Sequence, residues 1–162
     1  MKRGSTLFLK LIVVLLAIVV LTWMIVFPRS EGVAANLDLI SIYTNPFVIY
    51  LYVAWMPFFV ALHQAIKLLG FVENNTIFSQ AAVKAVRNIK YCAIVYIGFI
   101  AAAVSYILVM AKVTNGDDDP AGFVAIGLVL IFASSVIATA AAVFQRLLQN
   151  AVDIKSENDL TV

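Results

Sequence analysis

The chain has 162 residues, of which 64% are hydrophobic and 12% are charged. Soluble domains carry about 25% charged residues, so this composition excludes an ordinary water-soluble domain. The net charge of +2 gives no reason to expect direct nucleic-acid binding, and the single cysteine excludes a disulfide framework and a thiolate metal cluster. We therefore expect an integral membrane protein in which residues 1–162 form a single transmembrane domain.

Four stretches are long and apolar enough to cross a bilayer, which needs about 20 residues per helix. They cover about residues 7–27, 46–66, 91–111 and 121–145, and apart from Lys10 they contain no Asp, Glu, Lys or Arg. The first begins like a signal peptide, but its length favours a retained span. The pattern predicts an all-α, integral membrane four-helix bundle with up-down-up-down topology.

The basic residues are distributed unevenly around these spans. Nine of the eleven Lys and Arg residues fall on one predicted side, namely Lys2, Arg3, Lys10, Lys67, Lys84, Arg87, Lys90, Arg146 and Lys155. Only Arg29 and Lys112 fall on the other side. Because Lys and Arg near span ends favour the cytoplasm, we expect both termini and the middle loop to be cytoplasmic, in the cell membrane.

Prolines mark particular points of the predicted helices. Asn45-Pro46 and Asp119-Pro120 each pair a capping side chain with a proline suited to the first helical turn. Pro57 lies inside the second span, where it removes a backbone hydrogen bond and predicts a kink. This kink is either a hinge or a fixed bend whose freed carbonyl is satisfied by neighbours.

Small residues recur at helical spacing in the third and fourth spans, which favours close helix packing in a membrane. They are Gly98, Ala101, Ala102, Ser105, Ser134, Ala138 and Ala142. We expect these two helices to form the tightest seam of the bundle, with these residues facing it.

The middle loop contains a predicted amphipathic helix over about residues 79–90, with Ser79 as its N-cap. Its basic residues include Lys84 and Arg87, which alternate with apolar residues. We expect this basic face to lie on anionic headgroups of membrane lipids, with docking of a cytosolic protein as the alternative.

Few residues could carry chemistry. His63 is the one titratable side chain near the interior of a span, and it predicts either a proton relay or a neutral hydrogen-bonding group. Cys92 is expected to be a small apolar packing residue, and the acidic loop at 115–120 to serve turn formation and helix capping. No glycine-rich phosphate loop, nucleophile elbow, acid/base pair or metal-ligand set is present, so we expect no enzyme, no cofactor and no metal.

The cytoplasmic tail, residues 146–162, begins by continuing the fourth helix with an apolar stripe that includes Leu147, Leu148 and Ile154. Its last residues admit two interpretations. The first is a frayed helix end along the inner surface. The second is a short linear motif, in which Asp159, Leu160 and Val162 dock on a partner.

Three segments of the chain resemble the YoaS-like membrane proteins, a bacterial family of unknown function. They are the opening residues 1–10, Phe78-Ser79 with Asn88 to Cys92, and the closing residues 153–162. The resemblance implies a four-span protein of the cytoplasmic membrane without assigned catalytic or ligand residues. It also implies a neighbouring gene for a small helix-turn-helix transcriptional regulator.

The leading hypothesis is therefore a non-enzymatic membrane protein that acts through partners and modulates such a regulator, which its tail and basic helix would contact. A homo-oligomer is compatible with the sequence. A different hypothesis is a small oligomeric transporter or channel, in which Pro57 and His63 act and Ser105, Ser134, Ser135 and Thr139 line a polar path. A third is immunity to a membrane-active peptide.

Overall fold

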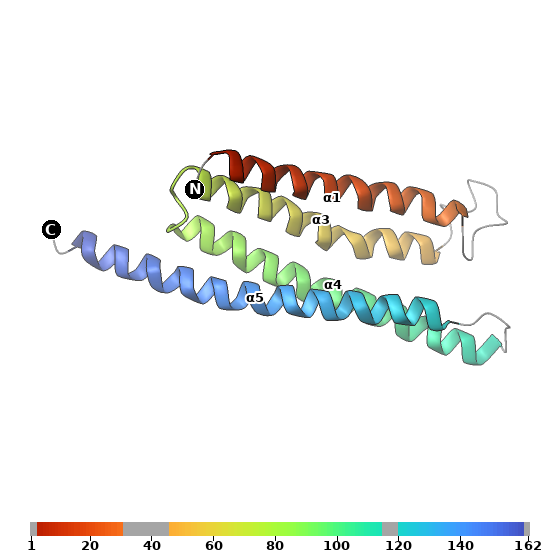
Figure 1. The fold of residues 1–162 in the computed structure, drawn as a ribbon. Helices are drawn as coiled ribbons and strands as arrows, with labels where there is room; N and C mark the ends of the chain where they lie inside the picture. The colour runs from red at the N-terminus through yellow and green to blue at the C-terminus, as the bar shows by residue number, and fades with distance from the viewer. Residues whose placement is uncertain (1–2, 31–45, 115–119, 161–162) are drawn as a thin grey trace. The chain divides into compact units, whose positions relative to one another are not determined.

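The computed structural model describes residues 3–30, 46–114 and 120–160, and their secondary structure is all-α (Figure 1). The helices are α1 (Arg3–Ser30), α3 (Pro46–Glu73), α4 (Gln80–Thr114) and α5 (Ala121–Leu160). Each of these four contains a segment long and apolar enough to span a membrane, which confirms the four predicted spans. The packing divides the chain into two compact units, Met1–Ile77 and Phe78–Val162.

The first unit is a pair of antiparallel helices, α1 and α3. At one end the rings of Trp23 and Trp55 meet edge to face, 6.2 Å between centroids, and the hydroxyl of Tyr52 donates a hydrogen bond of 3.1 Å to the carbonyl oxygen of Met24. At the other end Lys10 Nζ lies 2.5 Å from Glu73 Oε2. The opposed order of these contacts along the two helices establishes the antiparallel pairing.

The less exposed residues of α1 lie on one narrow face. They are Thr6, Lys10, Val13, Ala17, Val20 and Met24. The steps of four and three residues between them are those of a helix that packs on a single neighbour. Most of the remaining surface of α1 is apolar and exposed, as expected for a helix that faces lipid.

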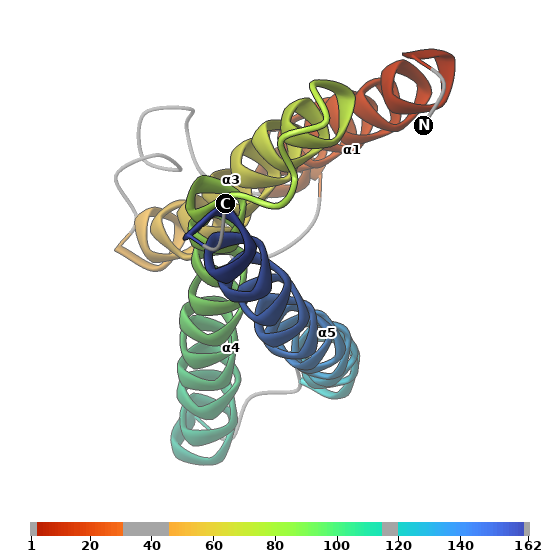
Figure 2. The same ribbon diagram turned by 90° about the vertical axis from the view of Figure 1, so that its left-hand side faces the viewer.

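The second unit is also an antiparallel pair, in which α4 and α5 cross at an angle (Figure 2). A regular series of less exposed positions runs along α4: Ala82, Val86, Ile89, Ala93, Tyr96, Ile100, Ala103 and Ile107. A matching series runs along α5: Gly127, Ile131, Ser134, Ala138, Ala141, Gln145, Leu148 and Val152. Both series advance by alternating steps of four and three, the spacing of helices that pack side chains into facing holes.

The pairing of the third and fourth spans is thus confirmed, but only half of the predicted seam is correct. On α5, Ser134 is buried and Ala138 and Ala142 are half-buried. On α4 the prediction is wrong, because the small residues expected in the seam are exposed, namely Gly98, Ala101, Ala102 and Ser105.

The reason lies in how the two surfaces fit. A Cβ atom at Gly127 would overlap Cγ2 of Val104 and lie 3.7 Å from Cγ2 of Ile100. Gly127 of α5 therefore leaves room for the larger side chain of Val104. The small residues that α4 does bury differ from the predicted ones and include Ala82, Ala93 and Ala103.

Helix α3 extends further than its apolar span. It continues through Gly70 to Glu73 and ends in a Schellman motif, in which Thr76 N–H donates to Phe71 O at 2.9 Å and Asn75 N–H to Val72 O at 3.3 Å. Asn75 has a φ of 56°, the left-handed conformation that asparagine tolerates better than most residues.

The predicted helix starts agree with the structure to within one residue. Pro46 is the first residue of α3, as predicted, whereas Pro120 lies one residue before α5 and accepts its first hydrogen bond, from Val124 N–H at 3.0 Å. Ser79 caps α4, since its Oγ accepts from Ala82 N–H at 3.3 Å. Asn45 and Asp119 lie outside the described residues. The helix continues through Pro57, and the kink there stays a prediction.

Candidate functional site

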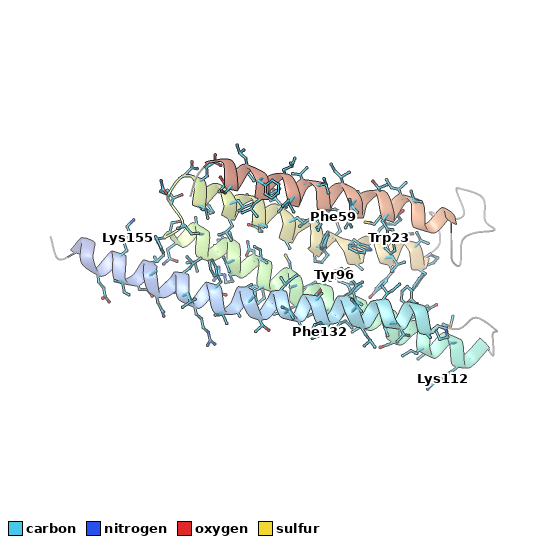
Figure 3. The ribbon with its side chains drawn as sticks, viewed as in Figure 1. Trp23, Phe59, Tyr96, Lys112, Phe132 and Lys155 are labelled. Carbon is cyan, nitrogen blue, oxygen red and sulfur yellow. The ribbon has the colours of Figure 1, made fainter. Side chains whose placement is uncertain are left out.

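The helices of the second unit are longer than a bilayer core. At 1.5 Å per residue, the 35 residues of α4 and the 40 of α5 measure about 52 and 60 Å, against a hydrocarbon thickness of about 30 Å. The charges of these helices gather at one end, with Lys112 at the other; Lys112 and Lys155 mark the two ends in Figure 3. We call the charged end, residues 80–90 of α4 and 146–160 of α5, the stalk.

The apolar side of the α4 part of the stalk is covered by protein, as is Leu148 of α5. Ala82, Val86 and Leu148 are 0%, 2% and 5% exposed. The amphipathic helix predicted at 79–90 forms the first turns of α4 and leads directly into the third span, as its pattern indicated. Its apolar side is not available for insertion into a lipid surface.

The two helices are joined where the stalk meets the apolar spans. Lys90 Nζ donates a hydrogen bond of 2.9 Å to Gln145 Oε1. The same ammonium group lies 4.9 Å from the centroid of the Tyr91 ring, within the range of a cation–π interaction. Tyr91 itself is 55% exposed. These contacts fix the position of an aromatic ring at the predicted edge of the hydrocarbon.

Lys84, Arg87 and Tyr91 are exposed and follow one another at intervals of three and four residues, so they share one face of α4. Neither the side chain of Lys84 nor that of Arg87 forms an ion pair or hydrogen bond with any other residue that the structure describes. The structure thus gathers two of the predicted site residues on one exposed face of the stalk.

The α5 side of the stalk continues the fourth helix, as predicted, but it is longer than the predicted helix and its apolar residues are arranged differently. Helix α5 continues to Leu160 and runs past the start of α4 (Figure 1). The predicted apolar stripe is divided, because Leu148 is buried whereas Leu147 and Ile154 are each 61% exposed.

The end of this helix carries local hydrogen bonds. Gln149 Nε2 donates to Asp153 Oδ1 at 2.8 Å, and Ser156 Oγ donates to Asp153 O at 2.8 Å. Asp159 and Leu160 belong to the final turn, whereas Val162 lies outside the described residues. If Leu160 docked on a partner as part of an extended strand, this last helical turn would have to unwind.

The candidates in the first unit lie on different parts of α3. His63 is exposed and shares a row with Val60 and Lys67, whereas Pro57 is half-buried. The aromatic rings near Pro57 pack edge to face, with 5.5 Å between the centroids of Trp55 and Phe58. Nothing among these contacts joins His63 to Pro57.

The predicted polar path is not brought together. Ser105, Ser135 and Thr139 are exposed, and each hydroxyl donates to the carbonyl oxygen four residues earlier, at 2.8, 2.8 and 2.9 Å. Ser134 alone of the four is buried in the seam between α4 and α5. The geometry of the described residues therefore gives no support to a hydroxyl-lined path along this unit.

Two polar residues with evident structural roles were missed at the sequence level, Glu73 and Gln145. Glu73 was placed in a loop because the span was judged to end before Gly70, yet it pairs with Lys10 across the first unit. The isolated Lys10 in an apolar run is a signal that could have prompted a search for an acidic partner. Gln145 was taken as the last residue of a span rather than as the partner of Lys90.

Four long apolar helices with polar groups at their ends define a multi-pass α-helical membrane protein. The chain belongs to the family described as protein of unknown function (DUF2975), whose model matches residues 11–162. It is 48% identical over 164 residues to the uncharacterized membrane protein YoaS of Bacillus subtilis (strain 168), and the match covers 100% of both chains. The resemblance noted from the sequence is thereby confirmed. No solved structure matches the chain.

Proposed function

We propose that the protein is a non-enzymatic four-helix protein of the cell membrane that acts by binding a cytosolic partner on the end of α5. Its topology is up-down-up-down, with both termini and the stalk in the cytoplasm. The partner class that we propose is a small helix-turn-helix transcriptional regulator, the expectation that came from the family resemblance.

The observation that carries this proposal is the length of α5. The helix continues about 22 Å beyond Gln145, at 1.5 Å for each of its last 15 residues, and it runs past the first residues of α4. Its exposed Leu147 and Ile154 stand beside charged residues on a rigid element. An amphipathic helix of this kind suits recognition by a groove on a partner protein.

Cross-linking in native membranes tests the proposal. The full-length protein, a variant that lacks residues 156–162 and the substitution Ile154→Lys are each cross-linked, purified and analysed by mass spectrometry. Lys112→Gln, at the opposite end of α4, is the control. A DNA-binding protein captured by the full-length and control proteins, and lost with the deletion or with Ile154→Lys, is the expected result. Equal capture by all four proteins, or capture of no DNA-binding protein, contradicts it.

A further inference from the structure

The exposed residues Lys84, Arg87 and Tyr91, which we call the basic face, lie at defined heights along α4. At 1.5 Å per residue, Arg87 lies about 6 Å and Lys84 about 10 Å beyond Tyr91 along the helix axis. All three residues belong to one continuous helix, so these heights are fixed by the backbone.

These heights match the polar layer of a bilayer. The total thickness exceeds that of the hydrocarbon core by about 10 to 15 Å, which leaves about 5 to 7 Å of headgroups on each side. With Tyr91 at the edge of the hydrocarbon, where aromatic rings are enriched, Arg87 falls within the headgroup layer. The backbone of Lys84 falls about 3 to 5 Å beyond this layer, and its long side chain can reach back toward the lipid.

The charges of the basic face are available for a ligand. Lys90 is occupied by Gln145 and Tyr91, but Lys84 and Arg87 have no polar partner among the residues that the structure describes. A guanidinium group binds phosphate oxygens through two parallel hydrogen bonds, and a lysine adds a point charge. The position and the charge together favour an anionic phosphate held at the membrane surface.

We propose that Lys84, Arg87 and Tyr91 bind the headgroup of an anionic phospholipid in the leaflet beside the stalk. This site lies in the first turns of α4, whereas the proposed partner site lies at the C-terminal end of α5. Failure of one proposal therefore does not contradict the other. Lys155 provides a matched control. It is exposed on α5, but its position ten residues beyond Gln145 places it about 15 Å from the span, outside the headgroup layer.

Electron paramagnetic resonance of spin-labelled lipids tests this inference. The full-length protein is reconstituted in phosphatidylcholine vesicles with spin-labelled phosphatidylglycerol or phosphatidylcholine, and the motionally restricted fraction gives the selectivity. We expect the wild type to favour phosphatidylglycerol. The Lys84→Gln and Arg87→Gln substitutions should each lower this selectivity by up to about fivefold, since a basic residue near an anionic surface contributes about 1 kcal/mol. Lys155→Gln should leave it unchanged.

Other outcomes would overturn the proposal. A wild type without selectivity, or a Lys84→Gln/Arg87→Gln variant that retains it, shows that the basic face does not bind lipid. Inorganic phosphate should displace no more labelled lipid than chloride at equal ionic strength, and displacement specific to phosphate would indicate a site for a soluble anion. Circular dichroism of each variant excludes loss of the fold as the cause. If the Lys84→Gln/Arg87→Gln variant lost a soluble protein partner in cross-linking but kept its lipid selectivity, the basic face would be assigned to protein binding instead.

Discussion

Gly98 and Gly127 are the same residue type in adjacent helices, yet their surroundings are opposite. A Cβ at Gly127 would overlap Val104, whereas a Cβ at Gly98 would have nothing within 4 Å. The sequence alone could not separate them, because spacing shows that a small residue is on a helix face but not which face the neighbour covers. A glycine can be assigned to a helix interface only when the surface of the neighbouring helix is known.

Replacement of Gly127 by alanine should destabilise the second unit by about 1 to 3 kcal/mol, because the added Cβ would overlap Val104 and force the helix backbones apart. The matched substitution Gly98→Ala should be neutral or stabilising by up to about 1 kcal/mol, through improved helix propensity. Unfolding of the purified protein by sodium dodecyl sulfate measures both values. Equal losses of unfolding free energy at the two positions would contradict the seam described above.

Asn75 gives a second prediction for a single residue. Substitution by valine should cost about 1 to 2 kcal/mol, because a β-branched side chain disfavours the left-handed conformation, whereas Asn75→Gly should be tolerated. The substitution Asn74→Val serves as control, since its backbone amide bonds normally to Gly70 O at 3.1 Å. The same unfolding measurement distinguishes them, and a harmless Asn75→Val would show that the turn can rearrange.

At the scale of elements, the existence of the four helices was predictable, whereas the residues at which α3 and α5 end were not. Hydropathy locates the part of a helix that matches lipid, so it placed the spans correctly. The backbone continues beyond the lipid until a capping group ends it, as Asn75 does for α3. For α5 the polar residues after Lys155 were taken as a tail, although they still form helical hydrogen bonds as far as Leu160. The sequence therefore predicted helix for most of the stalk, and it missed only the continuation of α5 from Ser156 to Leu160.

The pairing of α1 with α3 gives a further prediction for the helices. Lys10 and Glu73 are 28% and 22% exposed, so their ion pair is only partly screened by solvent. A double-mutant cycle with Lys10→Met and Glu73→Gln should give a coupling free energy of about 1 kcal/mol. The cycle Lys67→Met with Glu73→Gln is the control, because Lys67 is exposed elsewhere on α3. Additive effects of Lys10→Met and Glu73→Gln would show that the contact does not stabilise the pair.

For the whole molecule, the distribution of Lys and Arg predicts a single orientation. In a Cys92→Ser background, Asn74→Cys and Ser156→Cys should react with an impermeant maleimide only in inverted membrane vesicles. Asn115→Cys should react only from the opposite side, in intact cells. Labelling of positions 74 and 156 from different sides would refute an even number of spans between them, and labelling of both from outside would refute the proposed orientation.

The candidate site was predictable in its chemistry but not in its geometry. Lys84 and Arg87 stood out as basic residues near a span, and the structure places them on one exposed face. What the sequence could not show is that Lys90 is engaged by Gln145, whereas Lys84 and Arg87 remain exposed. His63 drew notice because it is the one titratable side chain near the interior of a span, and hydropathy alone could not show that it lies exposed on α3.

The division of the chain at Ile77 also bears on its synthesis. Each helix pairs with the helix that is made just before or after it, so the contacts within each unit join residues of modest sequence separation. The contacts of α1 with α3 require no residue after Ile77, and the first hairpin can therefore assemble while the ribosome is still translating the second. Helix α4 is covered by α5, the next helix to be synthesised. The packing face of α4 is therefore exposed to lipid only until α5 enters the membrane.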